Sequence, residues 1–154
     1  MKVYAVIRLR GSVKVRKEIL DMLKMLKLHR VNHCVLVPKT PDFEGMLKKV
    51  KDYVTYGEIK KETLVKLLKE RGRVIGNKKL DEETLKKITG FKSFEEFADA
   101  LLSGKVKLKD FEELKPVFRL SPPKKGLKSK KFHYPKGDLG YRGDAINELI
   151  ERML

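Results

Sequence analysis

The apolar residues of the first part of the chain switch repeatedly between a two-residue spacing and a helical one, and this pattern constrains the fold most strongly. Residues 2–10 alternate, so one face of a predicted strand carries only apolar side chains, namely Val3, Ala5, Ile7 and Leu9. Residues 13–27 place apolar side chains at helical spacing, with lysine and glutamate between them. Residues 30–38 are rich in β-branched side chains and end at a proline, which predicts a second strand.

A second helix is predicted to run from about residue 40 to Gly57. Thr40 is suited to the cap position and Pro41 to the first turn, and acidic residues follow near the positive end of the helix dipole. The expected buried face consists of Met46, Leu47, Val50, Tyr53 and Val54. Strand, helix, strand and helix within residues 1–56 predict an α/β unit that needs one more strand. The run KPVFRLS, residues 115–121, is the predicted third core strand.

The middle of the chain, residues 57–113, predicts a helical subdomain inserted before that third strand. Helices are expected at residues 60–71, 81–89 and 93–103, and a glycine follows each of them. Ser93 and Glu96 have the spacing of a capping box. The alternating run KVKLKDF, residues 105–111, is predicted as a small strand or a wing. The αβ core is accordingly assigned to residues 1–56 and 114–121, and the helical insertion to residues 57–113.

The composition changes abruptly after the third predicted strand. The segment PPKKGLKSKKFHYPKG, residues 122–137, has six lysines and no acidic residue. Prolines, glycines and lysines in this density neither build a core nor hold a helix, which predicts an extended basic arm. Helical spacing resumes after Gly143, so residues 122–154 are assigned to the arm and a C-terminal helix that holds its far end.

The net charge indicates a polyanionic partner. The chain carries 37 lysines and arginines against 21 aspartates and glutamates, a net charge of +16. The excess is concentrated, because residues 1–56 have a net charge of +8 and residues 116–137 of +7, whereas residues 57–115 have only +3. Apolar runs are too short for a membrane span, the N-terminus does not fit a secretory signal, and a lone cysteine excludes an intrachain disulfide. We therefore expect a cytoplasmic protein with no membrane partner.

His29, His33 and Cys34 lie within six positions and raise the question of a metal site or a catalytic centre. In a strand, however, His33 and Cys34 face opposite sides, and no second cluster supplies the remaining ligands of a structural zinc site. Cys34 lies among valines and leucines, which is typical of a buried thiol and not of a nucleophile. Phosphate-binding glycine motifs are also missing. We predict no enzyme, no metal, no cofactor and no small-molecule substrate.

Nucleic-acid binding explains the arrangement of basic side chains better than a metal site or a catalytic centre does. Arg8 and Arg10 share a strand face with Tyr4 and Val6, so either a second layer of the protein or a partner covers part of that face. Arginine forks suit phosphates and unpaired bases, lysines neutralise phosphates, and the rings of Phe132, His133 and Tyr134 are suited to stacking. The candidate RNA-binding residues from this argument are Arg8, Arg10, Gly11, Lys14, Arg16, Arg30, Asn32, His33, Lys124, Lys125, Lys128, Lys130, Lys131, His133 and Lys136.

Several motifs in the same order resemble a known family. IRLRG at 7–11, LKLHRVNHCVLVP at 26–38 and GMLKKVKDYVTYGE at 45–58 resemble the ribosomal protein L-thirty family of the large subunit, called L-seven in eukaryotes. FRLSPPKKGLKSKKFH at 118–133 and GDLGYRGDAIN at 137–147 are similar to the longer archaeal and eukaryotic members. The resemblance covers nearly the whole chain, and the composition is closer to the archaeal form.

The resemblance implies an α+β fold: a small βαβαβ core related to ferredoxin-like folds, with a three-stranded sheet. It implies a structural role on large-subunit ribosomal RNA, beside neighbouring ribosomal proteins, without enzymatic activity. It adds Arg119, Pro122 and Gly126 to the candidate residues. The alternative is a nucleic-acid-binding regulator outside the ribosome that uses the helical insertion as a helix-turn-helix reader, although the modest charge of the insertion disfavours it.

Overall fold

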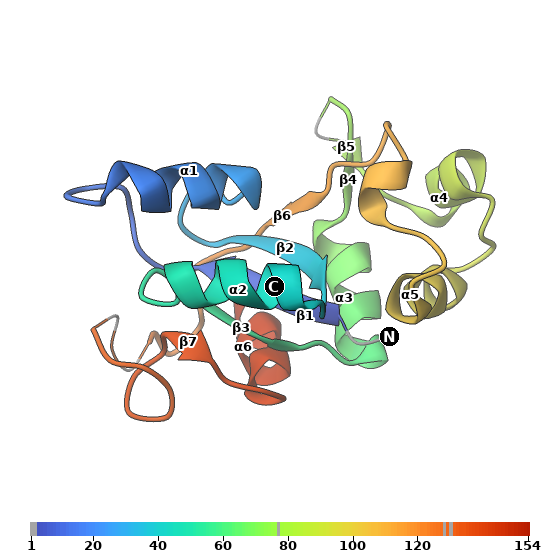
Figure 1. Ribbon diagram of the computed structural model, residues 1–154. Coiled ribbons are helices and arrows are strands. Elements are labelled where there is room, and N and C mark those ends of the chain that lie inside the picture. The colour runs from blue at the N-terminus through green and yellow to red at the C-terminus, as the bar shows by residue number, and fades with distance from the viewer. Residues whose placement is uncertain (1–2, 77, 128, 130) are drawn as a thin grey trace.

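The fold is α+β, with one five-stranded sheet and helices on both of its faces (Figure 1). A computed structural model describes residues 3–76, 78–127, 129 and 131–154. In chain order the elements are β1 (Val3–Arg8), α1 (Lys17–Met25), β2 (His33–Pro38), α2 (Pro41–Val50), β3 (Val54–Glu58), α3 (Lys61–Arg71), β4 (Arg73–Val74), β5 (Lys78–Lys79), α4 (Glu82–Thr89), α5 (Phe94–Ser103), the 3-10 helix η1 (Leu108–Asp110), β6 (Val117–Arg119), β7 (Gly140–Tyr141) and α6 (Ala145–Met153).

The strands of the large sheet follow the order β6–β2–β1–β3–β7. The pairs β6–β2, β2–β1 and β1–β3 are antiparallel, whereas the short edge strand β7 runs parallel to β3. Gly57 in β3 permits the close approach of the chain after β7, because a β-carbon there would overlap the carbonyl oxygen of Gly143. Strands β4 and β5 form a separate small hairpin.

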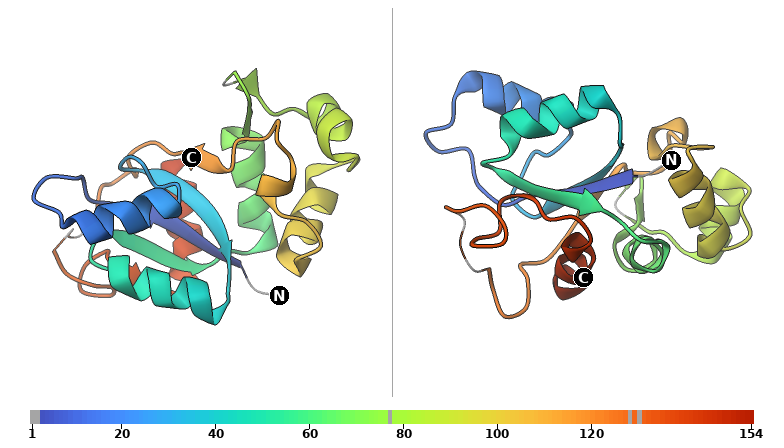
Figure 2. Two further views of the ribbon diagram at one scale, coloured as in Figure 1. Left: turned by 45° about the horizontal axis from the view of Figure 1, so that its top comes forward. Right: turned by 60° about the horizontal axis from the view of Figure 1, so that its bottom comes forward.

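Each face of the sheet is covered, so β1 is buried along its whole length. Helices α1 and α2 lie over one face, as the right-hand view of Figure 2 shows, and bury Tyr4 and Val6. Helices α3, α5 and α6 contribute to the core on the other face, which buries Val3, Ala5 and Ile7. Of the two covers that the sequence left open for the Tyr4 face, a second layer of the protein or a partner, the structure shows the first.

The predicted second helix is too long. Helix α2 ends at Val50, and after a turn the chain enters β3, which pairs with β1 from Val54 to Glu58. Tyr53 and Val54 satisfy helical spacing from Leu47 and Val50, but β-branched and aromatic residues also favour a strand. The register beside β1 resolves this competition, because Val54 and Tyr56 join the core under α1 and α2 while the chain remains hydrogen-bonded.

The core βαβαβ unit is thus complete by Glu58, and the prediction that residues 115–121 supply its third strand is wrong. Strand β6 does join the sheet, but as an outer strand beside β2, and β7 brings the total to five instead of the predicted three. The helical segment consequently follows the third strand of the core. The wing predicted at residues 105–111 is also wrong, because the regular element there is η1.

Capping signals in the sequence correctly predicted where helices begin and end. Thr40 accepts a hydrogen bond from the Phe43 backbone nitrogen at 3.4 Å, and Pro41 occupies the first turn of α2. Ser93 accepts a hydrogen bond from the Glu96 nitrogen at 3.3 Å and begins α5. Gly104 ends α5 in the left-handed region, at φ +80°. These caps depend on neighbours in sequence, which is why the sequence predicts them.

Cys34 is fully buried in the core beneath α3 and α6, as its strand position predicted. Burial raises the pKa of its thiol to about 12. Because the thiolate is the reactive form, we expect iodoacetamide at pH 8 to alkylate Cys34 in the folded protein at least roughly 100-fold more slowly than in urea. Mass spectrometry of time points measures both rates; equal rates would contradict the burial of this thiol.

Candidate nucleic-acid interface

Topology brings the predicted basic residues of the core to one end of the sheet. Strand β1 ends at Arg8, and its antiparallel neighbours β2 and β3 begin there, at His33 and Val54. Strand β6 ends at Arg119, which pairs with His33. The loop after β1, the α1–β2 loop, the α2–β3 turn and the start of the arm therefore lie at the same end, toward the left in Figure 1. We call this the basic end of the sheet.

Most candidate side chains at this end are accessible. Arg10, Gly11, Lys14, Arg16, Arg30 and Arg119 are exposed, and Asn32 and His33 are partly buried. Three of the four described non-glycine residues with positive φ belong to the candidate set: Lys14, Asn32 and Lys125. Such backbone conformations are sparsely populated and are kept where the surrounding structure requires them.

Arg8 differs from the others, because its side chain points into the protein and is only 3% exposed. Its guanidinium donates to the carbonyl oxygens of Arg10 at 2.8 Å and Leu28 at 2.8 Å, and to the hydroxyl of Ser12 at 2.9 Å. Burial lowers the pKa of this guanidinium. Arg8 therefore joins the loops at the basic end to each other, and we assign it to the framework and not to the contact surface.

His33 lies in a cluster of positive charge. Burial, followed by the charges of Arg119, His29 and Arg30, lowers the pKa of its imidazole. The ring is therefore neutral near pH 7 in the free protein, and its buried Nδ1 atom has no hydrogen-bond partner among the residues that the structure describes. Because this nitrogen is buried, it offers no hydrogen bond to an outside ligand, and a contact between His33 and RNA stays a prediction.

The arm is folded back onto the core. His133 Nε2 lies 2.7 Å from a carboxylate oxygen of Asp52, in the α2–β3 turn. The guanidinium of Arg10 donates to the carbonyl oxygen of Asp52 at 3.3 Å and lies 5.2 Å from the centre of the Tyr53 ring. A basic group of the core and a ring of the arm therefore meet at one turn.

The four arm lysines that the structure describes remain available to a partner. Lys124, Lys125, Lys131 and Lys136 are exposed, and the ammonium group of Lys136 lies 4.4 Å from the centre of the Phe132 ring. The predicted residues Lys128 and Lys130 lie outside the described residues. An exposed ring with an ammonium over it combines a stacking surface with a phosphate ligand.

Residues that the sequence did not indicate hold the arm in place. Arg152 of α6 donates to the carbonyl oxygens of Lys124 at 3.3 Å and Gly126 at 3.1 Å. Arg71 of α3 donates to the Ser121 hydroxyl at 2.7 Å. Each is an arginine near the C-terminal end of an amphipathic helix, a position that also suits an ordinary surface residue, so the sequence carried no signal for this role.

The far end of the arm is held by a buried ion pair between Arg142 and Asp138, whose side chains are 4% and 5% exposed. Arg142 donates through Nε to the Thr55 hydroxyl at 2.8 Å, and through a terminal nitrogen to an Asp138 carboxylate oxygen at 3.1 Å. The other carboxylate oxygen of Asp138 accepts from the Ser129 nitrogen at 3.0 Å. This cluster connects β3, the arm and β7.

Among the residues with a described placement, no three His, Cys, Asp or Glu side chains gather in the way that a metal ion requires. Cys34 faces the core beneath α3 and α6, whereas Val35 faces the core beneath α1 and α2, so alternation along β2 separates His33 from Cys34 as predicted. The described helices are also too short or too polar for any of them to cross a membrane.

Comparison with known proteins gives full-length similarity. A family model described as ribosomal protein L30p/L7e matches residues 4–54. The large ribosomal subunit protein uL30 of Archaeoglobus fulgidus is 55% identical over 97% of this chain and 99% of its own length. The proteins of the same name from Methanocorpusculum labreanum and Methanococcus maripaludis are 51% and 54% identical, over 97% and 98% of this chain and 99% of their own lengths. The chain belongs to the ribosomal protein L30p/L7e family.

Proposed function

We propose that this chain is a structural component of the large ribosomal subunit that binds ribosomal RNA through the basic end of the sheet and the arm. Its relatives are named large ribosomal subunit proteins and match it over nearly its whole length. The family is structural and not enzymatic. The choice of this surface rests on one observation: Arg10 of the core and His133 of the arm both contact Asp52. The basic end of the sheet and the arm therefore lie side by side.

The proposed interface uses two kinds of hydrogen-bond donor, arginines of the core and lysines of the arm. Arg10, Arg30 and Arg119 present exposed guanidinium groups, which bind phosphate oxygens in bidentate geometry or stack on bases. The lysines of the arm neutralise further phosphates and release counterions. Because hydrogen bonds at both ends restrict the arm in the free protein, less conformational entropy is lost when it binds.

In this proposal the partners are large-subunit ribosomal RNA and neighbouring ribosomal proteins, and the chain resides in cytoplasmic ribosomes. The alternative, a regulator that reads nucleic acid with the helical insertion, has less support. Residues 57–115 have a net charge of only +3, and the wing expected beside the helices is replaced by η1. The predicted insertion begins at residue 57, but β3 extends from Val54 to Glu58. The first two residues of the predicted insertion therefore belong to the sheet.

Ultraviolet cross-linking of assembled large subunits tests the choice of surface. We expect nucleotide adducts on peptides that contain Arg10, Arg30 or residues 131–137, because these segments line the basic end and the arm. Peptides from α4 and the β4–β5 hairpin serve as the internal comparison, since they contain exposed lysines. Adducts confined to α4 and the hairpin would instead support the regulator-like use of the insertion.

A further inference from the structure

Two loops at the basic end carry most of the candidate RNA-binding residues of the core. The first loop, residues 9–16, follows β1, and the second loop, residues 26–32, connects α1 to β2. Their candidate residues are Arg10, Gly11, Lys14, Arg16, Arg30 and Asn32. Neither loop contains a helix or a strand, so contacts with the rest of the protein determine how these residues are spaced.

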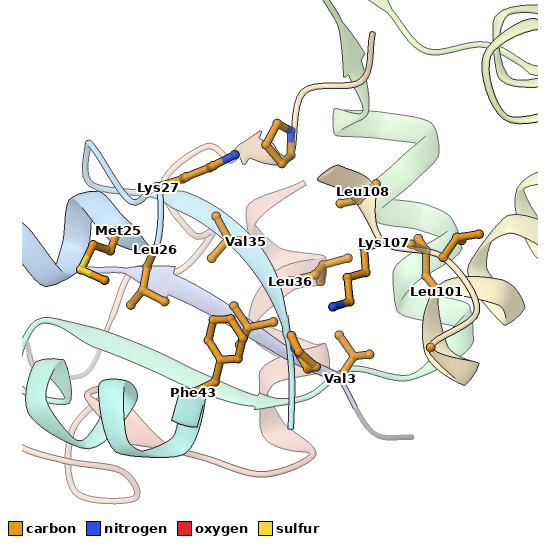
Figure 3. A pocket seen from close by; sticks show the side chains of 15 residues that line it. Val3, Met25, Leu26, Lys27, Val35, Leu36, Phe43, Leu101, Lys107 and Leu108 are labelled. Atoms are coloured by element: carbon orange, nitrogen blue, oxygen red, sulfur yellow. The ribbon is translucent and has the colours of Figure 1, made fainter. Parts of the chain in front are cut away.

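The second loop begins with a strained turn at the end of α1. Leu26 faces the apolar groove shown in Figure 3, and Lys27 follows it in the left-handed region at φ +63°. The Leu28 nitrogen donates to the carbonyl oxygen of Leu23 at 2.9 Å, which closes the helix in a Schellman motif. Because a lysine disfavours a positive φ, its neighbours hold this turn in place.

The guanidinium of Arg8 contacts both loops. In the first loop, its Nε donates to the Arg10 carbonyl oxygen at 2.8 Å, and a terminal nitrogen donates to the Ser12 hydroxyl at 2.9 Å. The other terminal nitrogen donates to the Leu28 carbonyl oxygen at 2.8 Å, in the second loop. The backbone carbonyl of Arg8 accepts from the Asn32 nitrogen at 2.7 Å. Among the described residues, no other side chain forms hydrogen bonds with both loops.

The geometry of these contacts requires an arginine. A guanidinium is a planar fork whose N–H groups point in fixed directions, whereas the ammonium group of a lysine is a single point on a flexible chain. Arg8 is only 3% exposed, and no acidic side chain in the described part of the protein forms an ion pair with it. Burial of a cation among neutral oxygens costs desolvation free energy, which a bridge between neutral groups would avoid. This arrangement therefore favours a role that depends on the fork.

We propose that Arg8 is a positioning residue for RNA binding, which holds the two loops at a fixed separation before RNA arrives. The exposed basic groups of both loops are then already spaced, so less conformational entropy is lost when they bind phosphates. This inference rests on the proposed function, because it concerns the same interface. A positioning residue affects the affinity for RNA but not the number of phosphate contacts, which the salt slope counts.

The variant Arg8→Lys keeps the positive charge and removes the fork. We expect its affinity for a ribosomal RNA fragment, measured by filter binding, to fall at least about tenfold, because the loop side chains must then order on binding. If the parent protein itself does not bind the fragment, the proposed function is overturned. If the parent protein binds and Arg8→Lys binds equally well, only the role of Arg8 is overturned.

The variant Arg8→Met distinguishes positioning from a direct contact with RNA. Its affinity should also fall at least about tenfold, while the slope of log affinity against log salt should match that of the parent protein, because the exposed basic side chains remain. A loss of roughly 0.7–0.9 from the slope would show that Arg8 itself binds a phosphate, and would overturn the proposal.

Hydrogen–deuterium exchange separates positioning from a general loss of stability. In free Arg8→Lys, the hydrogen-bonded amides of Arg10, Leu28 and Asn32 should exchange at least about tenfold faster than in the parent protein. The matched control is Leu85→Ala, which leaves a cavity beside α4, far from the basic end in Figure 1. The control should change neither these exchange rates nor the affinity for RNA. Equal changes in the two variants would contradict a specific role of Arg8.

Ser12→Ala removes one acceptor of the fork and leaves the buried charge in place, so it tests the proposal even where substitution of Arg8 prevents folding. It should lower the affinity for RNA about threefold in the parent protein. In the Arg8→Lys background it should have no further effect, because Ser12 acts through Arg8. An equal further loss in that background would show that Ser12 acts independently and would contradict positioning through this hydrogen bond.

Discussion

Neutralising four lysines of the arm should reduce the steepness with which salt weakens RNA binding. The variant replaces Lys124, Lys125, Lys131 and Lys136 by glutamine, and all four side chains are exposed. Each lost phosphate contact removes roughly 0.7–0.9 from the slope of log affinity against log salt, so the slope should fall by about 3. Filter binding to a ribosomal RNA fragment between low and moderate salt measures this slope.

Substitution is a sharper test here than deletion of the arm. Leu127 packs against the main core, so removing the segment would also remove apolar contacts and weaken the fold. Glutamine keeps the aliphatic part of the side chain and a polar end, and the four positions lie on the surface. Circular dichroism of the variant should therefore match that of the parent protein.

The matched control places the same four substitutions in the helical insertion, at Lys78, Lys79, Lys86 and Lys87. Both variants lower the net charge of +16 by the same amount, so any general effect of charge is equal in the two. We expect the control to keep a slope near that of the parent protein. If both variants lose the same slope, the arm makes no localised phosphate contacts.

Elements that depend on residues close together in the sequence were predicted, whereas elements that depend on contacts between distant parts of the chain were not. Strand β1, its partner β2 and the caps at Thr40 and Ser93 depend on alternation or on side chains a few residues apart, and they were predicted. Strand β7 has only two residues and exists because Gly140 and Tyr141 meet β3, more than 80 positions earlier in the chain. No local pattern specifies such a contact.

Arg8 shows the same limit in the proposed interface. An arginine near the end of a strand suggests a surface donor, yet Arg8 is buried and donates to the loops at the basic end. Tyr4 and Val6 on the same face were the signal for an enclosing layer, but the sequence did not show how far that layer extends. Arg10, two positions later and past the end of the strand, is exposed and keeps its candidate role.

Replacing Arg142 by methionine should destabilise the protein strongly. The substitution leaves the Asp138 carboxylate buried without its cation and removes the hydrogen bond to Thr55. Loss of one member of a buried ion pair typically costs about 3–5 kcal/mol, and we expect the free energy of unfolding to fall by an amount in this range. Urea titration followed by circular dichroism measures it, which suits a chain without tryptophan.

Two further variants separate the buried charge from other effects of the substitution. Lys66→Met breaks the solvent-exposed pair between Lys66 and Glu151, and it should cost only a small fraction of the Arg142→Met effect. Combining Arg142→Met with Asp138→Leu removes both buried charges and should recover part of the lost stability. If Arg142→Met costs no more than Lys66→Met, the buried pair does not anchor the fold.

The same variant connects stability with binding. Arg142 and Asp138 hold the end of the arm against β3, and the Asp138 carboxylate also accepts the Ser129 backbone hydrogen bond. Loosening this cluster releases the segment that contains His133 while its lysines stay unchanged. At a temperature where the variant remains folded, RNA affinity should therefore fall because the arm must order on binding, whereas the salt slope, which counts phosphate contacts, should change little. A loss of slope equal to that of the four-lysine variant would instead mean that the cluster is needed for the contacts themselves.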